Sequence, residues 1–387
     1  MSIDVKEMSL NLHREFKGEI RIEGLMHVTN KEELSLAYTP GVAAPCLEIA
    51  KKPEKAYDYT LKGRSVAVIS NGTAVLGLGD IGAAASLPVI EGKSLLHKEF
   101  AGTDAYPIAL DSTDKDEIVN IIKAISPGFA AIHLEDIKAP ECFYIEDKLK
   151  EILDIPVYHD DQHGTAISVL AGLYNGLKIV NKNIEDIKVV IDGAGASGIA
   201  IARLLLLAKV KNIILCDING AIVEGDEDLN YAQKDIAKVT NRNFEKGHIE
   251  DIIREADVFI GVCTGNVITT EMVKTMNKDS MVFALANPTP EIMPECAKLG
   301  GARITATGRG DFKNQMNNLL VFPGLFRGLL KARIKEITDD MKLDVAKAIA
   351  NLISDEELDE DYILPSVFNE DVVKAVEDAI IKYKDKV

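Results

Sequence analysis

The sequence predicts an α/β protein of two domains, the second a Rossmann-type doubly wound parallel sheet, with helices at the C-terminus. Three observations support this fold class. The chain has 387 residues, more than one ordinary hydrophobic core accommodates. Short apolar runs alternate with amphipathic stretches along most of it, as expected where strands and helices alternate. A glycine-rich turn at residues 193–198 then opens a second series of strands and helices.

The first half contains four apolar runs of strand length. These are "SVAVIS" (65–70), "YPIAL" (106–110), "FAAIHL" (129–134) and "IPVYH" (155–159). The stretch "STDKDEIVNIIKAI" (112–125) begins with residues that commonly cap helices. We therefore expect a first domain in which strands alternate with helices.

The second half begins again with "IKVVIDGAGASGIAIARLLLLA" (187–208). Its further strand candidates are "NIILCD" (212–217), "DVFIGV" (257–262), "MVFALANP" (281–288) and "RITATG" (303–308). From about residue 325 the pattern is helical to the end. We place the domain boundary between residues 162 and 182, along a helix that starts at His163. The expected parts are a first domain (1–162), a second domain (163–325) and a C-terminal helical segment packing on both (326–387).

Composition excludes several classes of protein. Hydrophobic residues make up 47% of the chain and charged residues 27%, as in ordinary globular proteins. A net charge of −17 argues against a surface that binds nucleic acid or anionic lipid. The five cysteines form no CxxC pair, and the polar N-terminal segment is no signal peptide. No run approaches the roughly 20 apolar residues of a membrane span. We expect a soluble cytoplasmic protein.

The stretch "VVIDGAGASG" (189–198) fits the GxGxxG pattern between an apolar strand and an apolar helix. The first glycine permits the tight turn, the second lets the backbone approach a pyrophosphate, and the third allows close helix packing. Asp217 closes the next strand, where an acid can bond the adenosine ribose and repel a 2′-phosphate. We predict NAD binding, with NADP as the alternative. The expected cofactor-binding residues are Gly193, Ala194, Gly195, Ala196, Ser197, Gly198, Asp217 and Asn287.

Two pairs of acids follow strand candidates: Glu135 with Asp136, and Asp160 with Asp161. The carboxyl ends of parallel strands share one edge of a sheet, so these four carboxylates are expected to converge. Their repulsion would drive some to protonate unless a cation lies between them. A hard divalent ion such as Mg²⁺ or Mn²⁺ prefers such oxygen ligands.

Two other interpretations of these residues stay open. Either acid pair alone is more often a helix cap after a strand. His159 and His163 are spaced like zinc ligands, but Gly164 and the neighbouring acids indicate a turn instead of one helix face.

Four further polar residues have ordinary structural explanations when each is taken alone. Tyr38 lies in a turn before a helix, and Lys93 follows Gly92 at the start of a helical pattern. Asn317 and Asn318 precede a helix, where asparagine is a common cap.

Taken together and in order, the motifs resemble the malic enzymes, specifically the short prokaryotic form. They are "AYTPGVA", "GLGDIG", "EGKSLL", "HLEDI", "HDDQHGTA", "GAGASG", "ANPTPE" and "NNLLVFPG". The resemblance covers nearly the whole chain. It implies oxidative decarboxylation of L-malate to pyruvate and CO₂, with NAD or NADP and Mg²⁺ or Mn²⁺. It also implies a catalytic, metal-binding first domain, an NAD(P)-binding second domain, and a homodimer or larger homo-oligomer.

The resemblance also implies a role for each matching residue. The expected metal ligands are Glu135, Asp136 and Asp161. The expected catalytic residues are Lys93 as general base, Tyr38 as general acid and Asp160 as the carboxylate that positions the lysine. Asn287 and Asn317 match positions that hold the substrate carboxylate, with Asn318 beside them. One departure is visible: larger members carry an arginine within "GERILGLGD", where this chain has Ala74 in "NGTAVLGLGD".

Proton abstraction by Lys93 requires a neutral amine, so we expect burial and a nearby cation to lower its pKa from about 10.4. The negative charge of Asp160 opposes that lowering of the Lys93 pKa, so we expect Asp160 to contribute by positioning the Lys93 amine. Malolactic conversion and oxaloacetate decarboxylation on the same scaffold remain alternatives. A non-catalytic dinucleotide sensor is disfavoured because Lys93 and all four acids are present.

Overall fold

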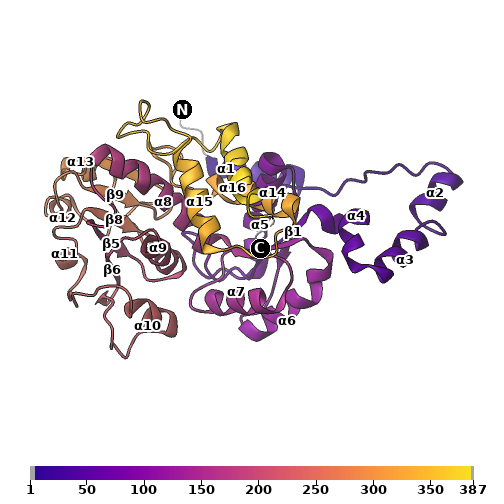
Figure 1. The fold of residues 1–387 in the computed structure, drawn as a ribbon, viewed down its shortest axis with the longest axis horizontal. Coiled ribbons are helices and arrows are strands. Elements are labelled where there is room, and N and C mark those ends of the chain that lie inside the picture. The colour runs from indigo at the N-terminus through magenta and orange to yellow at the C-terminus, as the bar shows by residue number, and fades with distance from the viewer. Residues whose placement is uncertain (1–4, 385–387) are drawn as a thin grey trace.

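The computed structural model describes residues 5–384, which form two parallel sheets and an arm that extends from them (Figure 1). The first sheet has the order β2-β1-β3-β4, and all its neighbouring strands are parallel. Its strands are β1 (Ser65–Ser70), β2 (Asp104–Ala109), β3 (Ala131–Leu134) and β4 (Val157–His159). Helices α5 (Ala83–Ala101), α6 (Lys115–Ile125) and α7 (Glu141–Ile152) connect them, with the short turn η3 (Ser126–Gly128) after α6.

The second sheet has the order β10-β9-β8-β5-β6-β7. Its strands are β5 (Lys188–Asp192), β6 (Asn212–Asp217), β7 (Gly220–Ala221), β8 (Val258–Gly261), β9 (Met281–Ala284) and β10 (Ile304–Thr307). Strand order reverses between β5 and β8, which is the point where doubly wound sheets bind their ligands. Only the two-residue β7 pairs antiparallel among the strands of the described chain. The α/β fold class with a Rossmann-type sheet is confirmed.

Short helices surround this sheet. They are α9 (Ala196–Leu207), α10 (Tyr231–Ala237), α11 (Ile249–Ile252), α12 (Thr270–Val273) and α13 (Pro294–Leu299). None of the helices in the described residues is long and apolar enough to cross a membrane.

Helix α8 (Asp160–Val180) joins the two sheets through one continuous apolar core. Ile167, Leu170 and Leu173 on α8 are fully buried between the strands of both halves. The expected helix start at His163 is wrong, because Asp160 and Asp161 form the first turn, where acidic side chains favour the positive end of the helix dipole. The expected turn at Gly164 is also wrong. This glycine lies inside α8, where a Cβ would come within 2.3 Å of the Asp160 Oδ1 atom.

The C-terminal part contains α14 (Phe322–Ala332), α15 (Asp339–Ala350) and α16 (Glu370–Ile381), after the short turn η4 (Asn318–Leu320). Helix α14 packs on α5 and α16, and α15 packs on α8 and α16, so this segment covers both halves (Figure 1). The expectation of helix from residue 325 to the end is wrong for residues 333–338 and 351–369, which lie outside the helices.

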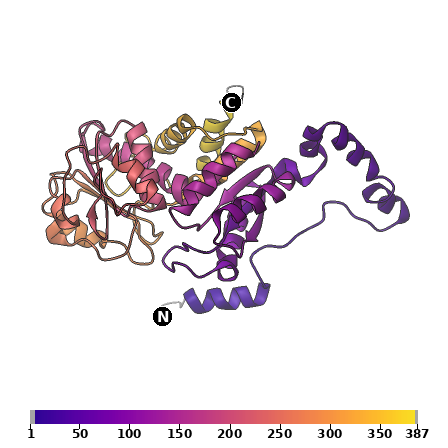
Figure 2. The ribbon, with the colours of Figure 1, turned by 90° about the horizontal axis from the view of Figure 1, so that it is seen from below.

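An arm precedes the first sheet. It consists of α1 (Val5–Phe16), α2 (Lys31–Ala37), α3 (Ala43–Lys51), η1 (Pro53–Lys55), α4 (Ala56–Tyr59) and η2 (Leu61–Arg64). None of the residues in α1 to α4 is buried. A long extended stretch leads to α2 and α3, which stand away from both sheets (Figures 1 and 2). The arm therefore has no core of its own.

Candidate active site

Four acids meet at the carboxyl edge of the first sheet. The register of β3 and β4 pairs Leu134 with His159, so the residues that follow each strand lie next to each other. One carboxylate oxygen from each of Glu135, Asp136 and Asp161 lies within 4.8 Å of the other two. The Asp136 N–H also donates to Asp161 Oδ2 at 2.9 Å. The convergence that the strand ends predicted is present.

The charges in this cluster are not balanced by protein atoms alone. Burial raises the pKa of both Asp136 and Asp161, and repulsion from neighbouring carboxylates adds to the shift. The buried Asp136 Oδ2 atom has no hydrogen-bond partner. Three crowded carboxylate oxygens, one without a donor, fit a hard divalent cation of the Mg²⁺ or Mn²⁺ type.

Lys93 reaches this cluster from the middle of α5, and not from a helix start as the sequence indicated. Its Nζ atom lies 2.5 Å from Asp160 Oδ2 and 3.3 Å from Glu135 Oε1. Burial favours a lower pKa for Lys93, but the carboxylates of Asp160 and Glu135 outweigh it and raise the pKa. The expected lowering is therefore absent in the protein alone, where Lys93 is an ammonium paired with Asp160. The Nζ atom also lies 4.8 Å from the Phe322 ring centroid.

The glycine-rich turn between β5 and α9 has the backbone that its sequence predicted. Gly193 has φ 117°, and a Cβ there would lie 2.9 Å from the Val262 carbonyl oxygen. A Cβ on Gly198 would lie 1.7 Å from the Gly193 carbonyl oxygen, so close helix packing requires glycine. The space around Gly195 is open, with no atom within 4 Å of a Cβ placed there. Backbone N–H groups of this turn are thus accessible to a phosphate.

The second domain touches the acid cluster through this turn. Ala194 is buried, Ala196 begins α9, and the Ser197 hydroxyl donates to the Asp161 carbonyl oxygen at 2.8 Å. The half-buried Asp217 closes β6, next to the turn, where its Oδ1 accepts from the Asn219 N–H. This is the position from which an acid can reach an adenosine ribose.

The three asparagines have different surroundings. The Asn318 Cβ lies 2.7 Å from where a Cβ on Gly164 would stand, against the first turns of α8. The Asn287 carbonyl oxygen lies 2.6 Å from a Cβ placed on Gly77, so the "GLGDIG" loop lies against Asn287. Asn317 caps η4 by accepting from the Leu319 N–H. Ala74, at the departure from the larger members, donates its N–H to the Asp136 carbonyl oxygen at 3.0 Å.

Tyr38 is not brought to this site within one chain. It ends α2 on the arm, with 66% of its surface exposed. Figure 1 shows α2 far from β1 and α5.

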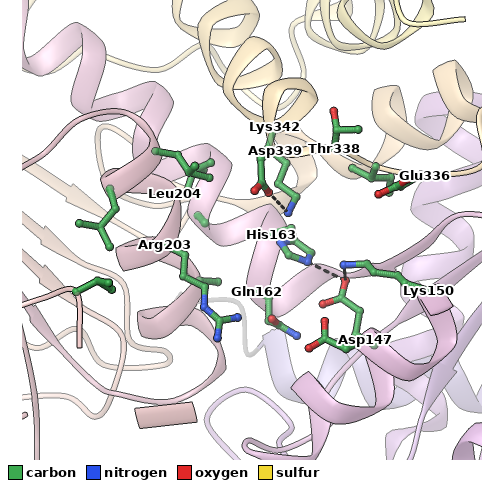
Figure 3. A pocket seen from close by; sticks show the side chains of 17 residues that line it. Asp147, Lys150, Gln162, His163, Arg203, Leu204, Glu336, Thr338, Asp339 and Lys342 are labelled. Carbon is green, nitrogen blue, oxygen red and sulfur yellow. Dashed lines mark hydrogen bonds and ion pairs between the residues drawn. The ribbon is translucent and has the colours of Figure 1, made fainter. Parts of the chain in front are cut away.

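The two histidines of the "HDDQHG" motif have other environments. Among the described residues, the groups spaced to hold a metal include neither His159 nor His163. The His163 Nε2 and Lys150 Nζ atoms both contact Glu146 Oε1 at 2.8 Å. His163 and Lys150 project into a cavity of about 800 Å³ between α7, α8, α9 and α15 (Figure 3). His163 thus ties α8 to α7.

Sequence reasoning missed His133, which contacts Glu135, and His97, which contacts His133. A usable signal existed for His133, because residues two apart in a strand point to the same face and Glu135 follows it at that spacing. No local pattern indicates His97 or Phe322, which reach the site from α5 and α14.

Comparison with known proteins agrees with this site. Residues 17–150 match the family model of the malic enzyme N-terminal domain, and residues 162–384 match the malic enzyme NAD-binding domain. The chain is similar to a bifunctional malic/malolactic enzyme of Bacillus subtilis, with 50% identity over 98% of this chain and 93% of that one. It is 52% identical to an NAD-dependent malic enzyme of Geobacillus stearothermophilus, over 98% and 79% of the two chains.

Solved structures show the same likeness. The NAD-dependent malic enzyme of Thermotoga maritima has a TM-score of 0.93 and 45% identity, covering 96% of this chain and 98% of that one. The malic enzyme of Pyrococcus horikoshii has a TM-score of 0.93 and 46% identity, covering 99% and 91%. With both family models matched over most of its length, the chain belongs to the malic enzyme family.

Proposed function

We propose that this chain converts L-malate to pyruvate and CO₂ with NAD⁺, or NADP⁺ as the alternative, and Mg²⁺ or Mn²⁺. One observation carries the proposal. The Ser197 hydroxyl of the nucleotide turn bonds the backbone of Asp161, while Lys93 contacts the same acid cluster. A hydride acceptor, a cation and a base would therefore meet around one small substrate.

The residues present fit both absent groups. Glu135, Asp136 and Asp161 would hold the cation, and residues 193–198 with Asp217 and Asn287 would hold the dinucleotide. When bound, the cation supplies a Lewis acid and the nicotinamide a hydride acceptor.

The chain's own residues perform the proton transfers and the binding. With its pKa lowered by the charge of the cation, Lys93 would be a neutral amine, and its Nζ would accept the C2 hydroxyl proton as the C2 hydrogen leaves as hydride, while Asp160 holds Nζ in place. After CO₂ departs, Tyr38 gives its phenolic proton to C3, which yields pyruvate. Asn287 and Asn317 hold the substrate carboxylate, with Asn318 beside them. Ala74 supplies no charge there, so amide donors take a larger share of carboxylate recognition than in the larger members.

We assign these tasks to three parts of the chain. Residues 1–162 form the catalytic and metal domain, 163–325 the NAD(P)-binding domain, and 326–387 the helical segment that packs on both. We place the protein in the cytoplasm, since its five cysteines are all free.

We further propose that the active form is a homodimer or larger homo-oligomer in which the arm of a second copy supplies Tyr38. The arm has large apolar side chains that stay exposed within the described part of the chain, among them Ile22 at 87% and Leu36 at 68%. On the loop that lies against Asn287, Leu76 and Leu78 are also about two-thirds exposed, at 65% and 67%. Apolar surfaces of this kind on a soluble protein are typical of subunit contacts.

The proposed reaction is tested by a steady-state assay with malate. NAD⁺ and NADP⁺ are compared with Mn²⁺ and with a chelator, and the product is identified by chromatography. We expect pyruvate, metal-dependent NADH formation and loss of turnover with the chelator. If turnover is unchanged in the presence of the chelator, the proposed metal requirement is wrong. If malate yields no NADH or NADPH, the proposed reaction is wrong. Lactate without net NADH would instead indicate malolactic conversion, a candidate that the name of the Bacillus subtilis relative favours.

Cofactor preference should depend on Asp217. Asp217→Ser removes the charge that repels a 2′-phosphate and an acceptor for the ribose, so the NADP/NAD ratio of kcat/KM should rise about tenfold, or about 1.4 kcal/mol. Asp235→Ser, at an exposed position on α10 paired with Lys238, is the matched control and should leave the ratio unchanged. If the NADP/NAD ratio of kcat/KM does not change in Asp217→Ser, another residue determines the choice between the two cofactors.

A further inference from the structure

Two buried histidines lie behind the acid cluster. His97 is one helical turn after Lys93 on α5, so both side chains lie on one helix face. His133 lies in β3 two residues before Glu135, which directly follows the strand, so the two side chains point to the same face of the sheet. Both imidazoles are fully buried. The elements that carry the base and a proposed metal ligand therefore also carry the two histidines.

The histidines form a hydrogen-bonded series that ends on Glu135. His133 Nε2 lies 2.9 Å from Glu135 Oε2, His97 Nε2 lies 3.0 Å from His133 Nδ1, and the Thr103 hydroxyl lies 3.2 Å from His97 Nδ1. The other carboxylate oxygen, Glu135 Oε1, is the one that faces Lys93 at 3.3 Å. The two oxygens of Glu135 thus have different partners.

One assignment of protons satisfies the whole series. Because the Glu135 carboxylate accepts, His133 must carry its proton on Nε2 and accept at Nδ1. His97 must then donate from Nε2, which leaves its Nδ1 as an acceptor beside the Thr103 hydroxyl, and that hydroxyl also lies 3.2 Å from the His97 carbonyl oxygen. With one proton on each ring, each imidazole has one donor and one acceptor in this series.

The packing around the pair fixes the ring planes. The Phe326 ring stacks on His133, with centroids 5.3 Å apart and planes 8° from parallel. Phe322 lies 4.9 Å from His97, and its ring also faces the Lys93 ammonium. The imidazoles can therefore not turn to present other atoms without moving α14.

We propose that His97 and His133 are positioning residues that orient Glu135 for the metal and for Lys93. His133 binds Oε2 and leaves Oε1 directed at the site, and His97 holds His133 in the tautomer that can do so. This inference rests on the proposed metal site. The inference goes beyond the metal site by assigning a task to two residues that touch neither substrate nor cofactor.

The test measures Mn²⁺ binding without substrate or turnover. The dissociation constant of Mn²⁺ is obtained from the electron paramagnetic resonance signal of the free ion, for the parent chain and for His133→Phe, His133→Gln and His97→Phe. Phenylalanine keeps the aromatic packing but removes the donor, so Mn²⁺ should bind roughly 10- to 100-fold more weakly in His133→Phe. Glutamine can donate to Glu135 and accept from His97, so His133→Gln should restore most of the affinity.

Two controls separate positioning from general destabilisation. Ser168→Ala removes a different buried polar group, a hydroxyl that donates to the Thr165 carbonyl oxygen on α8, and should leave Mn²⁺ binding unchanged. The dissociation constant of NADH should stay within about twofold of the parent value in every variant, since the pair does not reach the nucleotide turn.

A folded His133→Phe variant that binds Mn²⁺ as tightly as the parent would overturn the proposal, and so would a His133→Gln variant as weak as His133→Phe. If His133→Phe does not fold, His97→Phe carries the test. It keeps the bond to Glu135 but removes the donor that fixes the His133 tautomer, and parental affinity there would also overturn the proposal. A parent chain that binds no Mn²⁺ would reject the proposed metal site itself, and the role of the pair with it.

Discussion

Lys93→Ala should lower kcat for malate oxidation by about 10³-fold while leaving NADH binding within about twofold of the parent value, because a general base contributes roughly 10²- to 10⁴-fold. The loss has two sources. The variant lacks the only amine within contact of Asp160 and Glu135 among the described residues, and the buried Asp160 carboxylate loses its counter-ion. Within the described residues, the hydrogen bonds and ion pairs of Lys93 go to Asp160 and Glu135 and not to the nucleotide turn, which keeps its own backbone geometry.

The measurement combines single-turnover kinetics with a fluorescence titration of NADH, since the chain has no tryptophan to report binding by itself. Lys93→Gln keeps a donor to Asp160 without a base, so it should be equally inactive and should fold if Lys93→Ala does not. Lys98→Ala is the matched control on the same helix, at an exposed lysine paired with Asp104, and should keep full activity. A folded Lys93→Gln variant with more than a tenth of parental turnover would exclude Lys93 as the base.

The sheets were predictable because their strands are apolar and buried. β1 matches the expected run 65–70, and the ends of the other strands of the first sheet differ from the expected runs by at most two residues. The acid cluster followed from a general rule, since parallel strands place their carboxyl ends at one edge. β7 was missed because two antiparallel residues carry no periodicity.

The start of α8 was not predictable from local sequence. Two adjacent acids before a glycine indicate a turn, yet Asp160 is held in the first helical turn by Lys93, which is 67 residues away in the chain. The raised pKa of Lys93 was not predictable from local sequence either, because it depends on which carboxylates surround the amine. His97 and His133 stand 36 residues apart, and only the packing of α5 against the first sheet and α14 joins them.

Tyr38 is the clearest case in which a motif and a single chain disagree. The motif marks it as the general acid, but the structure leaves it exposed on an arm without a core. An acid that must protonate C3 has to come within hydrogen-bond reach of the site. If the arm of a second copy supplies Tyr38, the residue can be exposed in one chain and still reach the site of the other.

Intersubunit complementation decides this point with two inactive chains. Tyr38→Phe and Lys93→Ala homo-oligomers should each lose more than about 100-fold in kcat, since each lacks one proton-transfer group. Heterodimers of the two, co-expressed with different tags and purified through both, should recover about half of parental activity per dimer, because symmetry then gives one site with both groups and one with neither. If Tyr38 acted within its own chain, each site would lack one group and no activity would return.

The reciprocal heterodimer makes the opposite prediction. A chain carrying both Tyr38→Phe and Lys93→Ala, paired with a parent chain, should be inactive if the arms are exchanged, because the parent Lys93 then meets the mutant arm and the parent arm meets the mutant Lys93. The same dimer should keep about half of parental activity if each chain completes its own site. Activity in this dimer together with none in the first would show that Tyr38 folds back onto its own chain. We expect the first heterodimer to be active and this one inactive, because the described arm presents Ile22, Leu36 and Tyr38 to solvent and a second copy would cover them.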